Sequence, residues 1–239
     1  MLPFLIFGFF AEILAASVGF GASTILLPLA LLYFDFKTAL TLVAFFHLFG
    51  TLSRSYFFRA GLNRKIILQF GTTSIIFGLL GAFLANTLTQ TMLKGLLGVF
   101  LTLYGLLSLI KKDIHIKAAP ANLIFGGSLS GFLAGLIGTG GALRATFLAA
   151  IKSNKKEYLA TTAVVALAVD LTRIPVYLSS GFLASTYFWW LIPLFITAVI
   201  ATYFGKRLAL FLPARLFEKL ILLAITAAGF WFTYLWLFP

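Results

Sequence analysis

The sequence predicts an all-α polytopic membrane protein made of two inverted repeats. Three observations lead to this prediction: an apolar composition, a duplicated sequence and an uneven distribution of basic residues. Of the 239 residues, 62% are hydrophobic and only 10% are charged, whereas about 25% are charged in an ordinary soluble domain. A soluble chain of this size has too much surface for its volume to hide so many apolar side chains. Lipid is therefore the expected solvent for most of the chain.

The composition also excludes several classes of protein. A secreted domain, a cytosolic enzyme and a disordered chain are incompatible with so few charges. The sequence has no cysteine, which excludes disulfides, thiolate catalysis, iron–sulfur clusters and zinc–thiolate sites. We interpret the net charge of +12 as a sign of topology, since Lys and Arg collect on the cytoplasmic side of membrane proteins. The segment 1–4 lacks a basic region and a cleavage site, so we expect no signal peptide.

The two halves of the chain share features at a nearly constant offset. The recurring positions are LIFG at 5–8 and 123–126, the glycine pair Gly19 and Gly21 with Gly138 and Gly140, and Arg54 with Arg173. The offset is half the chain length, which indicates an internal duplication. We expect a first repeat over residues 1–112, a linker over 113–120 and a second repeat over 121–239.

Each predicted repeat contains four apolar segments. They lie at about 3–33, 37–58, 66–88 and 91–110 in the first repeat, and at about 121–150, 157–178, 184–206 and 214–238 in the second. Most are close to the length that spans a bilayer core. The segments 3–33 and 121–150 are longer and have glycines in the middle. As continuous helices they would be about 45 Å long, too long for one comfortable crossing.

The basic residues indicate how these two long segments are arranged. If all eight segments crossed once, the residues in loops would divide nine to six between the two faces. If the long segments are re-entrant hairpins, thirteen basic residues lie on one face and only Lys37 and Lys94 on the other, as the positive-inside rule expects. We therefore predict two hairpins and six crossings in the plasma (bacterial inner) membrane, with both termini outside. Tilted single helices with closely packed glycines are the alternative.

Three crossings per repeat would make the second repeat inverted relative to the first. Inverted repeats with broken helices are typical of secondary transporters, whose site lies near the midplane where the breaks meet. The second arm of each hairpin would begin there with unpaired amides, which attract anions. Ser and Thr hydroxyls near a tip could add donors or simply cap the helix. The tip residues expected at the site are Gly19, Gly21, Ser23, Thr24, Gly138, Thr139, Gly140 and Gly141.

The glycine motifs carry a resemblance to a known family. Gly19-Phe20-Gly21 and Gly138-Thr139-Gly140-Gly141, duplicated in a chain of this size, resemble the TauE/SafE family, also called the sulfite exporter or 4-toluene sulfonate uptake permease family. The resemblance covers the whole chain. It implies transport of sulfite, sulfoacetate and other sulfonates. Ala142 departs from the pattern, since many relatives have a further glycine at that position.

Ionisable side chains inside the apolar segments are the other candidate site residues, since each costs about 2.5–3.5 kcal/mol to insert. They are Glu12, His47, Arg54, Arg144, Asp170 and Arg173. An arginine fork suits a sulfonate, sulfite or carboxylate, so the three arginines are candidates for substrate binding. Each has an alternative role. Arg54 could snorkel to the interface, Arg173 could pair with Asp170 one turn earlier, and Arg144 could pair with either acid.

The acids and the histidine are candidates for ion coupling. Glu12 is the preferred proton carrier, Asp170 is the second candidate, and sodium coupling stays open. His47 could titrate or bind the anion, or it could be a hydrogen-bonded packing residue. We expect small anions and the lipid bilayer as partners, no nucleic acid, and a monomer or a homodimer.

The function predicted from the sequence is a secondary transporter of small organic or sulfur-containing anions that works by alternating access. An anion channel with the same groups is the main alternative, and the sequence does not separate the two. An intramembrane hydrolase would use Ser23 as nucleophile and His47 as base, and a scaffold subunit is a further possibility. The sequence has no P-loop, Rossmann motif or metal-ligand cluster, so we expect no cofactor and no metal.

Overall fold

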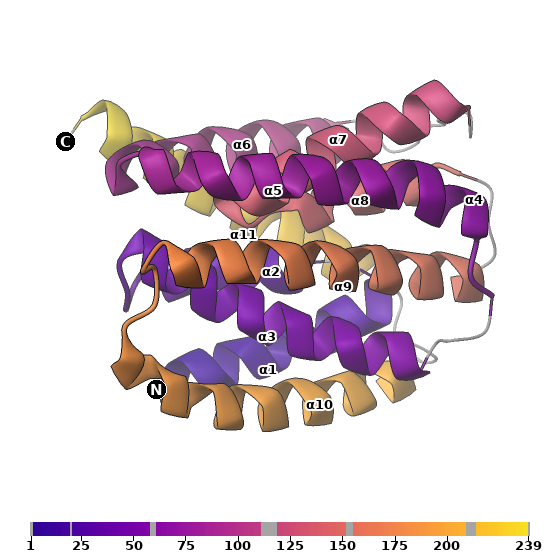
Figure 1. Cartoon of the computed structure of the whole chain (residues 1–239), viewed down its shortest axis with the longest axis horizontal. Helices are drawn as coiled ribbons and strands as arrows, with labels where there is room; N and C mark the ends of the chain where they lie inside the picture. Colours follow the sequence, from indigo (N-terminus) through magenta and orange to yellow (C-terminus); the bar gives the residue numbers. More distant parts are fainter. Residues whose placement is uncertain are drawn as a thin grey trace.

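The structure is a computed structural model of the chain. It describes residues 2–19, 21–57, 61–110, 119–151, 155–208 and 214–238. Within these ranges the regular structure is helical, with no strand. The long helices lie side by side along the longest axis of the molecule, and both termini lie at the same end (Figure 1). The predicted all-α fold is confirmed.

The helices of the first half are α1 (Leu2–Val18), α2 (Ala22–Ala30), α3 (Phe36–Phe57), α4 (Arg64–Ile66), a π-helical turn (Ile67–Gly71), α5 (Thr72–Thr87) and α6 (Gln90–Ile110). Those of the second half are α7 (Pro120–Ile137), α8 (Gly140–Ala149), α9 (Lys155–Ser179), a 3₁₀ turn (Ser185–Trp190), α10 (Leu191–Leu208) and α11 (Ala214–Leu237). The helix α4, the π-helical turn and α5 follow one another without a break. Most of the predicted linker 113–120 lies outside the described residues.

The helices α1 and α2 form a hairpin. Phe4 at the start of α1 and Phe34 just after α2 pack edge to face, with ring centroids 5.6 Å apart. A continuous helix would separate these rings by about 45 Å. Gly19 and Gly21 flank the reversal with φ of +96° and +110°, a region that glycine adopts without strain. Phe20, between them, lies outside the described residues.

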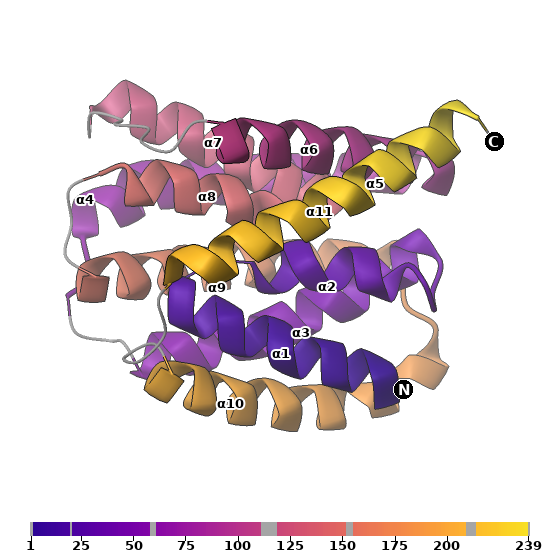
Figure 2. The ribbon, with the colours of Figure 1, turned by 180° about the vertical axis from the view of Figure 1, so that it is seen from behind.

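The helices α7 and α8 form the second hairpin. Phe125 near the start of α7 and Phe147 near the end of α8 have ring centroids 6.3 Å apart. Gly138 ends α7 in the left-handed conformation, and the Ser130 hydroxyl donates to the carbonyl oxygen of Gly140 at 2.8 Å. In both hairpins the second arm runs back beside the first (Figure 2). The prediction that each long segment folds back on itself is confirmed.

Several helices have the length and apolar composition of a membrane crossing. In the described part of the chain they are Phe36–Phe57, Arg64–Thr87, Gln90–Ile110, Pro120–Ile137, Lys156–Ser179 and Ser185–Leu208. Five of these correspond to predicted crossings, whereas Pro120–Ile137 is the first arm of the second hairpin. The helix α11 contributes the apolar stretch Leu222–Leu237. These features are those of a multi-pass membrane protein.

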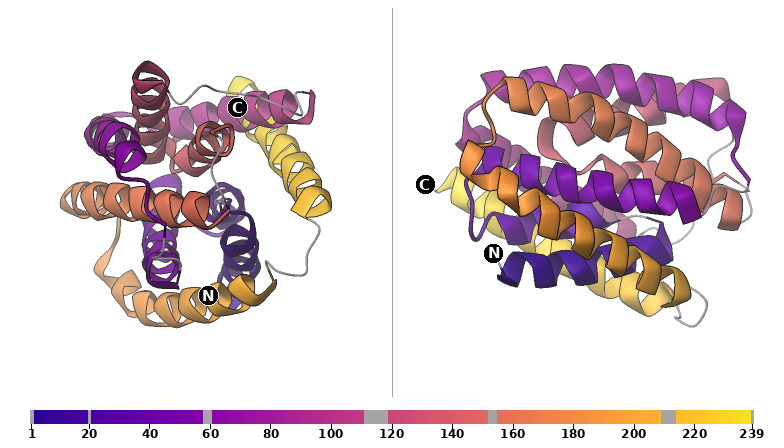
Figure 3. Two further views of the ribbon diagram at one scale, coloured as in Figure 1. Left: turned by 90° about the vertical axis from the view of Figure 1, so that its right-hand side faces the viewer. Right: turned by 60° about the horizontal axis from the view of Figure 1, so that its bottom comes forward.

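The first arm of each hairpin packs on a helix from the other half of the chain. α1 packs along α10 and α7 along α5, while α3 packs on α9 and α6 on α11. Figure 3 (left) shows this arrangement end-on. Glycines allow the closest approach: a side chain on Gly81 of α5 would collide with the backbone of Phe132 in α7. Two related halves are expected to pack in this way, with the first hairpin arm of each half against the other half. The inverted repeat itself stays a prediction.

The basic side chains gather at one end of the molecule. Those described there are Arg64 and Lys65 in α4, Lys156 in α9, Lys206 and Arg207 in α10, and Lys219 in α11. The corresponding helix ends lie opposite the termini, at the right of Figure 1. Lys37 is in the first turn of α3 and Lys94 is the fifth residue of α6, and both helices start at the end that holds the termini. We call the end opposite the termini the basic end.

Candidate functional site

The ionisable residues that the sequence places inside the apolar segments are all buried. Glu12, His47, Arg54, Arg144, Asp170 and Arg173 are each at most 6% exposed. A buried charge is costly unless it is paired and hydrogen-bonded. The partners of each group therefore indicate its role.

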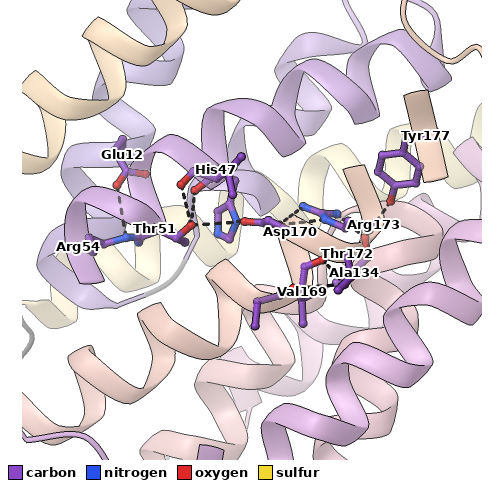
Figure 4. Close-up of polar contacts among 12 residues, drawn as sticks. Glu12, His47, Thr51, Arg54, Ala134, Val169, Asp170, Thr172, Arg173 and Tyr177 are labelled. Atoms are coloured by element: carbon purple, nitrogen blue, oxygen red, sulfur yellow. Dashed lines mark hydrogen bonds and ion pairs between the residues drawn. The ribbon is translucent and has the colours of Figure 1, made fainter. Parts of the chain in front are cut away.

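Asp170 uses both of its carboxylate oxygens. Its Oδ1 accepts from Arg173 Nε at 3.0 Å and lies 2.8 Å from Arg173 Nη2. Its Oδ2 lies 2.6 Å from His47 Nδ1 (Figure 4). The remaining Arg173 nitrogen, Nη1, donates to the carbonyl oxygen of Ala134 in α7. The ion pair that was one alternative for Arg173 is present, and each nitrogen of its guanidinium group has a partner within the protein.

Tyr177, which the sequence analysis did not single out, extends this network. It is fully buried, and its hydroxyl donates to the carbonyl oxygen of Gly135 at 2.5 Å. Its ring stacks on Phe182 with centroids 5.4 Å apart. Arg173 and Tyr177 thus hold the last carbonyls of α7, just before the second hairpin tip. The sequence could have indicated Tyr177 only through its spacing. It lies four residues after Arg173, and residues four apart on a helix share a face.

Glu12 and Arg54 form a second buried pair. Arg54 Nε lies 3.4 Å from Glu12 Oε1, and the Thr202 hydroxyl of α10 donates to the same oxygen at 2.9 Å. Glu12 Oε2 is buried without a hydrogen-bond partner. Gly50 provides the space, because a Cβ there would lie 2.5 Å from the Glu12 carboxyl carbon. Arg54 and Arg173 match in the sequence, and each pairs with a carboxylate, which belongs to another helix for Arg54 and to the same helix for Arg173.

Among the described residues, Arg144 of α8 has no counter-ion. It is 3% exposed, and its Nε is buried without a hydrogen-bond partner. In the described part of the chain it forms no ion pair with Glu12 or Asp170, whose carboxylates have the partners given above. A Cβ on Gly141 would lie 3.5 Å from Arg144 Nη2 and 3.8 Å from Ser23 Oγ. Arg144 therefore lies where the two hairpin tips meet.

A pocket brings Arg54 and Arg144 together. The residues that line it are Gly19, Thr51, Arg54, Arg144, Leu159, Thr162, Ala163 and Ala166. The Thr162 hydroxyl is buried without a partner, whereas the Thr51 hydroxyl donates to the carbonyl oxygen of His47 at 2.9 Å. Two arginines and two threonines thus line one small space with otherwise apolar walls. Such a combination suits an oxyanion.

The predicted tip residues contribute unequally to this arrangement. Gly19 lines the pocket, and Gly141 lies beside Arg144. Gly138 and Gly140 are packed against neighbouring residues of the protein, so a Cβ at either position would meet them closely. Gly21, Ser23, Thr24 and Thr139 are buried at the tips without lining the pocket. The hydroxyls of Thr24 and Thr139 have no hydrogen-bond partner. Substrate binding by these residues stays a prediction.

The comparison with protein families identifies the group to which the chain belongs. The model of the sulfite exporter TauE/SafE family matches residues 4–232. The chain belongs to the TauE/SafE family. No curated protein and no solved structure matches it significantly. TauE/SafE membership implies a membrane transporter related to sulfite and sulfonates, not an enzyme.

Proposed function

We propose that this TauE/SafE protein is a secondary transporter that binds a small sulfonate- or sulfite-like anion between its hairpin tips and moves it by alternating access. One observation carries the proposal: the pocket is lined by two buried arginines, and among the described residues only one of them has a carboxylate partner. Backbone at Gly19 and the free Thr162 hydroxyl would complete the site. The other tip residues and Arg173 would support its shape.

The charges around the pocket leave one positive charge without a partner. Glu12 pairs with Arg54 and Asp170 pairs with Arg173, whereas Arg144 forms no ion pair with any described residue. An unpaired buried charge costs several kcal/mol, and ionisable groups inside membrane segments usually mark a substrate path. A bound anion would neutralise Arg144. Its guanidinium fork can donate two parallel hydrogen bonds to two oxygens of one sulfonate head.

The position of the pocket supports one-sided access. Arg54 is in the last turn of α3, and Leu159 and Thr162 belong to the early turns of α9, so the pocket lies toward the basic end. Toward the other end, Arg173 and Tyr177 are fully buried and bound to the end of α7. A carrier that exposes its site to one side at a time would have such an arrangement in one of its states.

We also propose an orientation and a location. The basic end would face the cytoplasm under the positive-inside rule, which places both termini outside the plasma membrane of a bacterial cell. The pocket would then be reached from the cytoplasm in this state.

An anion channel is the second candidate, because it would use the same pocket. A channel needs a continuous path, whereas Asp170, Arg173 and Tyr177 are buried and hydrogen-bonded on the side toward the other end. These contacts favour a carrier.

The test is counterflow in proteoliposomes. A panel of sulfite, sulfoacetate, taurine, aryl sulfonates and carboxylates is first screened for anions that raise the melting temperature of the purified protein. The best anion is then loaded unlabelled into liposomes, and uptake of the labelled form is followed. A carrier accumulates label transiently, whereas a channel only dissipates the gradient.

Two variants test whether this flux depends on the pocket. We expect counterflow in the wild type and in Arg64→Met, which removes an exposed arginine at the basic end, and no counterflow in Arg144→Met. Wild-type counterflow in Arg144→Met would refute the site. Flux through the wild type that neither saturates nor shows counterflow would support the channel.

A further inference from the structure

We propose that Glu12 sets the charge of the anion that the pocket accepts. With Glu12 ionised the pocket binds a monoanion, and a dianion binds only together with one proton, which Glu12 takes up. This inference rests on the proposed anion site and specifies its substrate class.

Arg54 connects Glu12 to the pocket. Its Nε faces Glu12 Oε1 at 3.4 Å, and Arg54 itself lines the pocket. Glu12 is completely buried and does not line the pocket. It would therefore act on the anion through its charge and through the position of Arg54, not by contact.

Few other charged groups face Glu12. From α3 it meets Arg54, and from α10 the uncharged Thr202 hydroxyl. Asp170 of α9 acts on it only at longer range. The helix α2 has no titratable side chain, and the described charged side chain of α11, Lys219, is exposed. The charge of Glu12 thus bears mainly on Arg54 and the adjacent pocket.

The sum of the charges selects the ligand. Glu12, Arg54 and Arg144 together carry one net positive charge when Glu12 is ionised, and one monoanion neutralises it. When Glu12 is protonated the sum is two positive charges, which one dianion neutralises. A net charge in a buried site costs several kcal/mol, so these two neutral combinations are preferred over a dianion beside ionised Glu12.

The hydrogen bonds of Glu12 are compatible with both charge states. Oε1 receives the Thr202 hydroxyl and faces Arg54, whereas Oε2 is buried without a partner. A proton on Oε2 would leave the contacts of Oε1 in place. Asp170 differs, since its Oδ1 binds Arg173 and its Oδ2 binds His47. A proton on Asp170 would remove the counter-ion of Arg173. Arg173 does not line the pocket and could not pair with the anion instead, which makes Glu12 the better acceptor.

The experiment compares methanesulfonate with sulfate, two sulfur oxyanions of similar shape that carry one and two negative charges at neutral pH. Titration calorimetry of the purified protein in buffers of different ionisation enthalpy measures the protons taken up with each anion. We expect none with methanesulfonate and about one with sulfate, whose affinity should fall about tenfold for each pH unit of increase above the pKa of Glu12.

Variants of Glu12 separate its charge from its shape. Glu12→Gln keeps the size of the side chain and removes the charge. We expect it to bind sulfate without proton uptake and to shift the preference toward sulfate by about tenfold or more, which corresponds to about 1.4 kcal/mol. Glu12→Asp keeps the charge and should retain the wild-type preference. Arg144→Met should lose both anions.

The outcomes distinguish the inference from the proposed function. If neither anion binds the wild type or Glu12→Gln, or if binding survives in Arg144→Met, the anion site itself is refuted. If anions bind through Arg144 but sulfate takes up no proton, or if Glu12→Gln leaves the preference unchanged, only the role of Glu12 is refuted. Proton uptake is measured on the wild type, so the test remains valid even if a Glu12 variant does not fold.

Discussion

Replacing Arg144 by methionine is expected to stabilise the unliganded protein and to abolish its response to anions. Most substitutions in a binding site leave stability unchanged or reduce it. Arg144 is different, because its guanidinium is 3% exposed and has no counter-ion in the described part of the chain. Methionine matches the stem of arginine up to Nε in length and has a flexible apolar chain, so it can occupy that part of the space.

The magnitude follows from the burial of Arg144. A buried donor without a partner costs about 1–3 kcal/mol, and Arg144 Nε is such a donor. Arg144 also lines the pocket. We therefore expect Arg144→Met to increase the free energy of unfolding by about 1–3 kcal/mol. This gain should be seen only without anion.

The assay is denaturation in detergent with and without the best anion of the screen. An anion at a hundred times its dissociation constant stabilises a protein that binds it by about 2.7 kcal/mol. The wild type should therefore equal or overtake Arg144→Met as the anion is added, while the variant stays unchanged. Arg64→Met, an exposed control, should behave like the wild type. A variant that is less stable than the wild type without anion, yet still responds to it, would refute this account of Arg144.

Three further changes follow from the same contacts. Thr162→Asp should place a carboxylate in the pocket near Arg144, raise the melting temperature without anion and weaken anion binding by about tenfold or more; unchanged binding in a titration would contradict this. Asp170→Asn should leave Arg173 with an uncompensated buried charge and lower the free energy of unfolding by about 3–5 kcal/mol in denaturation experiments. Little loss of stability would mean that the pair is unimportant. Gly81→Ala should force the backbone of α7 away from α5 and cost about 1–3 kcal/mol, whereas a neutral result would mean that the helices separate freely.

The hairpins could be predicted because they depend on local and statistical signals. Glycines at the centre of two overlong apolar segments indicate breaks, and the distribution of Lys and Arg indicates that the chain turns back there. The contact of Phe4 with Phe34 confirms this for the first hairpin. The π-helical turn over 67–71 has no such signal. It depends on how α5 fits against α7 and α9, which no short stretch of sequence encodes.

The candidate site was predictable only as a set of residues. Intramembrane charges are rare, so Glu12 and Arg144 stand out in the sequence. Their partners do not, because pairing depends on how each helix is rotated about its axis. Tyr177 and Thr162 were missed for a different reason: tyrosine and threonine are common in apolar helices, and only burial and hydrogen bonding distinguish these two.

The two matching arginines differ in the residue that lies one turn before each of them. Asp170 precedes Arg173 by three residues, and Thr51 precedes Arg54 by three. In the second half the Asp170 carboxylate fills the fork of Arg173 at 2.8–3.0 Å, where an anion would otherwise bind. In the first half Thr51 donates to its own helix, and space remains beside Arg54. Asp170 is thus a resident counter-ion for one arginine, and the transported anion would play the same part for Arg144 beside the other.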